Sequence, residues 1–162
     1  MRIPRHLPLA VVTLAWLMFI FSFFLPATDV LSIGGTAPDT PLTGWQAFTT
    51  SFEVFGSPFI LLIPQEPRLL LLLAFPPINL VMLLSPLLAA LVWERAWILS
   101  GLLLPFGIVP WLLPKDFTGN LFAGFYLWDS SFFLMGAGCI LASIAWKQAC
   151  ETEIQRLHDN VA

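Results

Sequence analysis

Charged residues are scarce in this chain of 162 residues, in which ten acids and seven bases make up only 10% of the sequence. An ordinary globular protein carries about 25% charged residues, which cover its apolar core with a polar surface. Hydrophobic residues account for 58% of this chain, and its mean hydropathy is +0.86. The scarcity of charge therefore excludes an ordinary soluble domain and predicts that lipid surrounds most of the chain.

Cysteine and histidine are also rare. Cys139 lies inside an apolar stretch and Cys150 lies just past its end, so a disulfide framework is not expected. His6 and His158 lie near the two ends of the chain, where they cannot ligate a haem or a pigment inside a bilayer. No two His, Cys or carboxylate residues have metal-ligand spacing, and no basic cluster suggests a nucleic-acid surface. The sequence thus predicts no cofactor, no metal site and no nucleic-acid partner.

Catalytic motifs are missing from the sequence as well. It contains neither a G-x-S-x-G elbow nor a glycine-rich phosphate loop with its lysine. No Lys, Arg, Glu or His falls in the middle of an apolar stretch, where an ionisable residue usually marks a function. We therefore expect a protein that is not an enzyme.

Apolar stretches long enough to cross a membrane occur over residues 8–25, 69–93, 96–113 and 126–146. A bilayer core about 30 Å thick needs about 20 helical residues. Helices are expected because lipid offers no hydrogen-bond partner to a free backbone. The sequence predicts an all-α, four-transmembrane-helix bundle, a single membrane domain over 1–162 with an outer loop over 26–68 and a tail over 147–162.

The first stretch has a second interpretation. Arg2 and Arg5 precede its apolar run, as basic residues do in a signal peptide. The run is longer than the usual apolar core of about 7–15 residues, and the sequence over 25–28 is a poor cleavage site. We expect a retained span, with cleavage as the alternative.

The basic residues are divided unequally between the two sides of the predicted bundle. Five fall on one side, namely Arg2, Arg5, Arg95, Lys147 and Arg156. Only Arg68 and Lys115 fall on the other side. The positive-inside rule then places both termini in the cytoplasm, and a bacterial cell inner membrane is the expected location.

The tryptophans follow the same division. The predicted cytoplasmic ends carry Trp93, Trp97 and Trp146, and the opposite face carries Trp45, Trp111 and Trp128. This placement is typical of the aromatic belts at membrane interfaces. Trp16 is the exception, in the middle of the first stretch, and is expected to pack against a neighbouring helix or lipid tails.

The outer loop contains a patterned segment in which an aromatic residue recurs every three or four positions: Trp45, Phe48, Phe52 and Phe55. This spacing predicts one aromatic face of a short helix. Thr43, with Gln46 three residues later, fits a capping box at the start of that helix. Beside a membrane, such a helix is expected to lie in the interface.

The fourth stretch carries small residues on one face, namely Ser131, Gly138, Ala142 and Ala145. Small residues let membrane helices approach one another closely. Two interpretations follow: packing within the bundle, which we favour, and self-association.

The tail is expected to continue the fourth helix. It carries a narrow apolar stripe of Cys150, Ile154, Leu157 and Val161. The stripe belongs either to a solvated helix end, which we favour, or to a docking strip for a cytoplasmic partner.

Asn79 in the second stretch and Asp129 in the fourth form the candidate polar site. Pro76, Pro77 and Pro86 tend to kink the second stretch. They are either ordinary prolines of a membrane helix, which we favour, or the sign of a bent pair of helices around a small cavity at Asn79. Asp129 is expected to reach water or headgroups at the interface. The alternative is a proton or cation site near the outer face.

Three motifs point to a family. They are Ser22-Phe23-Phe24-Leu25-Pro26-Ala27 in the first stretch, Gly44-Trp45-Gln46-Ala47-Phe48 in the outer loop, and Gly124-Phe125-Tyr126-Leu127-Trp128 followed by Ser131-Phe132 in the fourth stretch. With these motifs the chain resembles small uncharacterised four-helix integral membrane proteins of bacteria. The resemblance implies the four-helix layout and implies no activity.

Two functions are compatible with these features. The first is a non-catalytic integral membrane protein, an accessory, assembly or scaffold subunit of a membrane complex. Its partners would be the lipid bilayer, other membrane-protein subunits or a second copy of the chain. The second is a small transporter, channel or lipid-binding protein, suggested by the proline-containing second and third stretches and by Asn79 and Asp129.

Overall fold

The computed structural model describes residues 3–4, 6–28, 41–53, 73–91, 93–112 and 121–160. Within these residues the α-helices are α1 (His6–Ser22), α2 (Gly44–Glu53), α3 (Phe75–Leu91), α4 (Trp97–Phe106) and α6 (Ala123–Asp159). Short 3-10 helices, η4 (Trp93–Arg95) and η5 (Val109–Leu112), precede and follow α4. The strands β1 (Pro26–Thr28) and β2 (Leu42–Thr43) form one antiparallel pair. The expectation of a mostly helical, all-α chain is confirmed.

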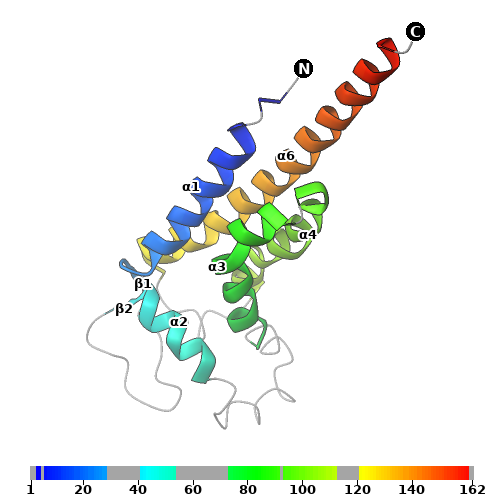
Figure 1. Ribbon diagram of the computed structural model, residues 1–162. Helices are drawn as coiled ribbons and strands as arrows, with labels where there is room; N and C mark the ends of the chain where they lie inside the picture. Colours follow the sequence, from blue (N-terminus) through cyan, green and yellow to red (C-terminus); the bar gives the residue numbers. More distant parts are fainter. Residues whose placement is uncertain are drawn as a thin grey trace.

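Helix α6 is the longest described element, and α1, α3 and α4 lie beside it (Figure 1). The N-terminus and the last turns of α6 lie at one end of the molecule, which we call the terminal end. The strands and α2 lie at the opposite end, which we call the strand end (Figure 1). Helix α1 therefore runs antiparallel to α6.

Helices α1 and α6 meet through residues that recur at intervals of four and three. The buried residues of α1 are Pro8, Val12, Ala15, Phe19 and Ser22. Buried residues at the same intervals on α6 are Ser131, Met135, Gly138, Ala142 and Ala145. The rings of Phe19 and Phe132 meet edge to face, with 6.2 Å between their centroids. This repeat is the pattern of knobs-into-holes packing between helices.

Helix α3 begins at Phe75, so Pro76 and Pro77 lie in its first turn, where a helix needs no backbone donor. Pro86 lies inside α3 and leaves the carbonyl of Met82 without its usual N–H partner. The hydroxyl of Ser85 donates to that carbonyl at 2.6 Å and replaces the missing donor. Residues 69–72 of the predicted second stretch lie outside the described residues.

Trp16 of α1 packs on α3, as the sequence predicted for a tryptophan in the middle of a stretch. Its indole Nε1–H donates to the carbonyl of Leu83 at 3.0 Å. This carbonyl is adjacent to that of Met82, which lacks its helical donor because of Pro86. The bond joins the first two apolar helices.

The third apolar stretch is interrupted, although the sequence predicted a helix across 96–113. Helix α4 ends at Phe106, residues 107–108 form a turn, and η5 follows. Pro110 has no N–H to donate to the carbonyl of Phe106, so the α-helix cannot continue through it. A Cβ on Gly107 would lie 2.5 Å from the ring of Phe133, so glycine at this turn permits close packing on α6.

Helix α6 begins at Ala123 and continues without a break to Asp159. The predicted helical continuation of the fourth stretch into the tail is confirmed. Among the residues that the structure describes, α6 alone is long and apolar enough to cross a membrane. Three shorter apolar helical segments of 10–17 residues accompany it: α1, α3 and the segment Trp97–Leu112, which comprises α4, the turn over 107–108 and η5.

Backbone hydrogen bonds at the strand end connect the segments next to α1, α2 and α6. Pro26 pairs with Thr43 in the two-stranded sheet, and the N–H of Phe122 donates to the carbonyl of Ala27 at 2.9 Å. The capping box at the start of α2 is confirmed: the N–H of Thr43 donates to Oε1 of Gln46 at 2.8 Å, and the N–H of Gln46 donates to Oγ1 of Thr43 at 3.3 Å.

Candidate functional site

Asp129 is buried, which corrects the expectation that its carboxylate reaches water. Its exposed fraction is 6%, and the indole Nε1–H of Trp111 donates to its Oδ2 at 3.3 Å. The turn over 107–108 brings η5, and with it Trp111, back over α6. No hydrogen-bond partner for the buried Oδ1 is present among the described residues. A buried carboxylate oxygen without a donor is costly, and it marks this position as a candidate site.

Asn79 is also buried, with an exposed fraction of 4%. Its Oδ1 accepts a hydrogen bond from the indole Nε1–H of Trp128 at 2.9 Å. Trp128 also packs against Phe75 at the start of α3, with 5.7 Å between ring centroids. Asn79 and Asp129 are thus held by two different tryptophans, and no hydrogen bond joins them among the described residues.

The aromatic face of α2 packs partly on the end of α1. The ring of Phe23 lies 5.8 Å from that of Trp45 and 5.2 Å from that of Phe48, measured between centroids. Phe48 in turn contacts Phe52 at 5.2 Å, and Trp45 is 54% exposed. The predicted face therefore exists and serves both as a contact to α1 and as an exposed surface. Phe55 lies outside the described residues.

The small residues of the fourth stretch face inward. Ser131, Gly138, Ala142 and Ala145 are all buried within the chain. A Cβ on Gly138 would lie 2.9 Å from Cγ2 of Val12 and 3.2 Å from its backbone nitrogen, so α1 packs closely against α6 there. A second copy of the chain has no access to this face, and its packing role is internal.

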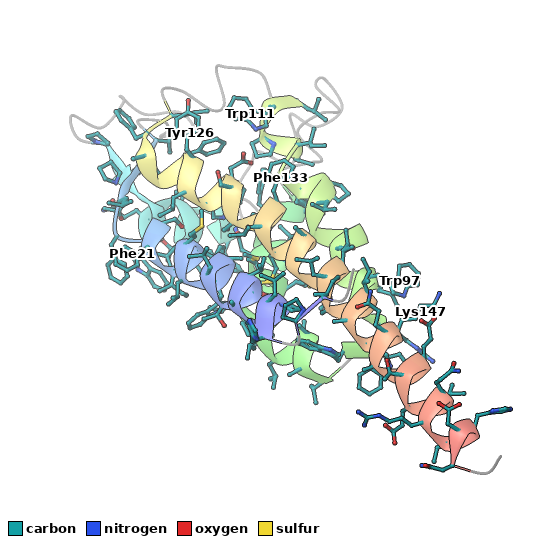
Figure 2. The ribbon with its side chains drawn as sticks, turned by 90° about the horizontal axis from the view of Figure 1, so that it is seen from above. Phe21, Trp97, Trp111, Tyr126, Phe133 and Lys147 are labelled. Atoms are coloured by element: carbon teal, nitrogen blue, oxygen red, sulfur yellow. The ribbon has the colours of Figure 1, made fainter. Side chains whose placement is uncertain are left out.

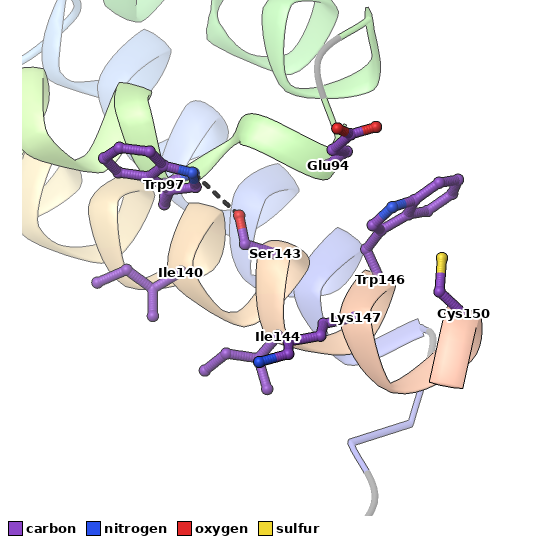
Figure 3. Close-up of a pocket in the computed structure, with 8 residues that line it drawn as sticks. All are labelled: Glu94, Trp97, Ile140, Ser143, Ile144, Trp146, Lys147 and Cys150. Atoms are coloured by element: carbon purple, nitrogen blue, oxygen red, sulfur yellow. Dashed lines mark hydrogen bonds between the residues drawn. The ribbon is translucent and has the colours of Figure 1, made fainter. Parts of the chain in front are cut away.

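A groove of about 560 Å³ opens at the terminal end beside α6 (Figure 3). Its lining residues are Glu94, Trp97, Ile140, Ser143, Ile144, Trp146, Lys147 and Cys150. The backbone N–H of Trp97 donates to Oγ of Ser143 at 2.9 Å (Figure 3). Trp97 is the first residue of α4, where a backbone N–H has no acceptor within the helix, and Ser143 supplies an acceptor from α6.

Sequence reasoning missed two of these contacts, Ser143 with Trp97 and Trp111 with Asp129. The partners are 46 and 18 residues apart, and neither pair forms a recognisable motif. Only the rule that buried polar groups need partners could have suggested a search for them.

The apolar stripe of the tail is exposed. Ile154 is 68% and Leu157 is 60% exposed, and Cys150 is exposed as well. Val161 lies outside the described residues. Figure 1 shows the last turns of α6 extending beyond the other helices.

Within the described ranges, no group of three or more His, Cys, Asp or Glu residues could hold a metal ion. Comparisons of the chain with family models, with curated proteins and with solved structures give no match. The resemblance to small four-helix membrane proteins of bacteria therefore stays a prediction.

Proposed function

We propose that this chain is a non-catalytic integral membrane protein whose four apolar helical segments cross the bilayer, and that it serves as an accessory, assembly or scaffold subunit of a membrane complex. A bacterial inner membrane with both termini in the cytoplasm is the proposed location.

The observation that carries the proposal is where the apolar and polar side chains lie: large apolar side chains face outward and several polar side chains face inward, the reverse of a soluble protein. Large apolar side chains are exposed on every apolar helix: Leu9, Leu14, Leu17 and Phe21 on α1, Leu80, Leu84, Leu87 and Leu91 on α3, Ile98 and Leu102 on α4, and Phe133, Ile140 and Ile144 on α6. Six polar side chains of the same helices are buried, namely Ser22, Asn79, Ser85, Ser100, Asp129 and Ser131, whereas Thr13 and Ser130 are exposed. Soluble monomers rarely expose so much contiguous apolar surface. Lipid is the solvent that suits it.

Helix lengths are compatible with crossing. The 17 residues of α1 and of α3 give each a length of about 25 Å, against a hydrocarbon core of about 30 Å. Short spans are accommodated by local thinning of the bilayer and by flanking interfacial residues.

Interfacial side chains support the proposed orientation. Trp111 and Tyr126 lie toward one end of the molecule, and Trp97 and Lys147 lie toward the other (Figure 2). The basic residues that the structure describes are Arg95, Lys147 and Arg156, which lie toward the terminal end. The positive-inside rule favours a cytoplasmic terminal end.

A scaffold or accessory role is supported by the surfaces at the terminal end. The exposed stripe on the last turns of α6 is available for a partner outside the bilayer, and the groove beside α6 adjoins it at Lys147 and Cys150. At the strand end, Asn79 and Oδ2 of Asp129 accept hydrogen bonds from Trp128 and Trp111, and Oδ1 of Asp129 has no hydrogen-bond partner among the described residues.

The test has two parts, performed on the full chain. Washing membranes at alkaline pH should leave the protein in the pellet, and native electrophoresis in several mild detergents should show a mass well above 18.0 kDa after correction for bound detergent and lipid. Release by alkali would contradict membrane integration. A clean monomer in every mild detergent would contradict the role as a subunit.

A second function, a small transporter, channel or lipid-binding protein, is favoured by the buried Oδ1 of Asp129, which has no hydrogen-bond partner among the described residues. An ionisable group inside a membrane usually marks a site for a proton, an ion or a headgroup. The test compares the double variant Asp129→Asn, Asn79→Leu with the wild type in reconstituted vesicles, for proton and cation flux and for retained lipid. Glu94→Gln, at an exposed carboxylate, is the control. Unchanged flux and lipid retention in the double variant would exclude this function.

A further inference from the structure

Helix α6 has a second line of residues at intervals of three and four, distinct from the line that packs on α1. Its members are Phe133, Gly136, Ile140, Ser143, Lys147, Cys150, Ile154 and Leu157. We call this line the outer seam. The unbroken helix keeps all of these residues on one slowly winding face.

Helix α4 packs on part of the first half of the outer seam, in which Phe133 and Ile140 remain 40% and 39% exposed. A Cβ on Gly136 would lie 2.5 Å from Cγ of Leu104, and Ser143 accepts the hydrogen bond from the backbone of Trp97. Helix α4 begins at Trp97, so its cover stops beside Ser143, and the groove opens there (Figure 3). From Lys147 onward the seam is exposed, and within the described part of the chain no element packs on it.

The exposed half of the outer seam has the composition of a two-stranded coiled coil. With Lys147 and Ile154 at the a positions, Cys150 and Leu157 occupy the d positions. Ile at a with Leu at d favours parallel dimers, and a single Lys at a is a known device for fixing register. Helix α4 packs on the first half of the same seam, so we expect a helix to pack on the second half as well.

We propose that this occupant is the same segment of a second copy of the chain, packed in parallel along Lys147, Cys150, Ile154 and Leu157. The inference rests on the proposed membrane location, because two copies in one membrane extend their tails from the same face and in the same direction.

Charge placement agrees with the parallel arrangement. Glu153 at g of one helix lies in register with His158 at e of the other, so a carboxylate meets an imidazole. An antiparallel pair would instead bring together equivalent g positions, or equivalent e positions, which here carry Glu153 and Glu151.

The segment from Lys147 to Asp159 is about 20 Å long, which is short for a coiled coil in free solution. Membrane anchoring raises the effective concentration of the two tails, and the apolar helices hold each one already formed. Association of this segment is therefore expected in the membrane rather than with isolated peptides.

Cys150 is a natural reporter at a d position, where the two copies should face each other. Mild oxidation of the full-length protein in membranes should give a disulfide-linked dimer. Cys150→Ser, which retains the buried Cys139, should abolish it. In the Cys150→Ser background, Ile154→Cys and Leu157→Cys should restore the dimer. The matched controls Gln155→Cys and Asp159→Cys, at exposed positions b and f, should give at least about five-fold less dimer.

Three outcomes would overturn the inference. Equal yields at 154, 155, 157 and 159 would indicate random collision in the membrane. Crosslinking at 150 or at 157 but not at both would indicate an antiparallel or displaced contact. No dimer from any seam position, with a crosslink to another protein instead, would exclude a second copy and leave the proposed subunit role intact. Alkaline extraction of the same membranes separates these outcomes from a failure of the proposed membrane location.

Discussion

The two parts of α6 have opposite surroundings although they form one continuous helix. In the first part, residues 123–145, buried small and apolar residues contact α1 on one face and α4 on another. In the second part, residues 146–159, the apolar residues Ile154 and Leu157 are exposed. The first part packs on α1 and α4, whereas the apolar stripe of the second part lies beyond these helices. Stability should therefore depend on the first part, and association on the second.

Truncating a buried side chain in the first part of α6 should lower the free energy of unfolding more than any other substitution considered below. Phe132 is fully buried and packs on the rings of Phe19 and Trp128. Phe132→Ala should lower the free energy of unfolding by about 3–5 kcal/mol, measured by denaturant titration in mixed micelles. Leu157→Ala, in the exposed part, should change it by less than about 0.5 kcal/mol. Similar losses for both variants would contradict the division of α6 into two parts.

Enlarging Gly138 should have the next largest effect on stability, because α1 packs closely against this position. Gly138→Leu should cost about 2 kcal/mol of stability by forcing the two helices apart. Gly101→Leu is the matched control, since a Cβ at Gly101 meets nothing within 4 Å. The same titration measures both variants. Equal behaviour at the two glycines would mean that the contact with Val12 does not limit the packing.

The hydrogen bond from Trp128 to Asn79 should contribute about 1 kcal/mol, the usual upper range for such bonds between membrane helices. Trp128→Phe and Asn79→Leu should each destabilise the protein, and together they should cost less than the sum of the two. A double-mutant cycle measures this coupling. Fully additive losses would indicate that the bond has no energetic role.

Ser143 marks the boundary between the two parts, and its loss should have a smaller effect. Ser143→Ala removes the acceptor for the backbone N–H of Trp97 and should cost about 0.5–1 kcal/mol, measured as a lower thermal midpoint in detergent. Ser130→Ala, on the exposed face of α6, should leave that midpoint unchanged. A loss at Ser130 equal to that at Ser143 would exclude the capping role.

Breaking the ion pair in the tail should change the stability of the protein the least. Arg156 and Glu153 form a pair at 3.9 Å whose side chains are largely exposed, and water and salt weaken such pairs. Arg156→Gln should leave the thermal midpoint unchanged within error. A clear decrease would show that the tail contributes to stability, and the contrast between the two parts of α6 would have to be revised.

Features that depend on neighbouring residues were predictable. The capping box of Thr43 and Gln46, the aromatic face of α2 and the continuation of α6 into the tail all follow from spacings of three or four residues. The placement of Asp129 was not predictable, because its burial depends on Trp111, which a turn and a 3-10 helix return to α6. The sequence predicted one helix over 96–113, and only the structure shows that α4 ends at Phe106 and that η5 follows a turn.

The sequence by itself determined which segments are apolar and helical, which faces carry small or aromatic residues, and where the tail stripe lies. Only the tertiary structure decided that the small-residue face of α6 belongs to α1, that Ser143 caps α4, and that the outer seam loses its cover beyond Trp97. The physical reason is that helical periodicity defines the faces of each helix, whereas the partner of each face depends on contacts between residues far apart in the chain.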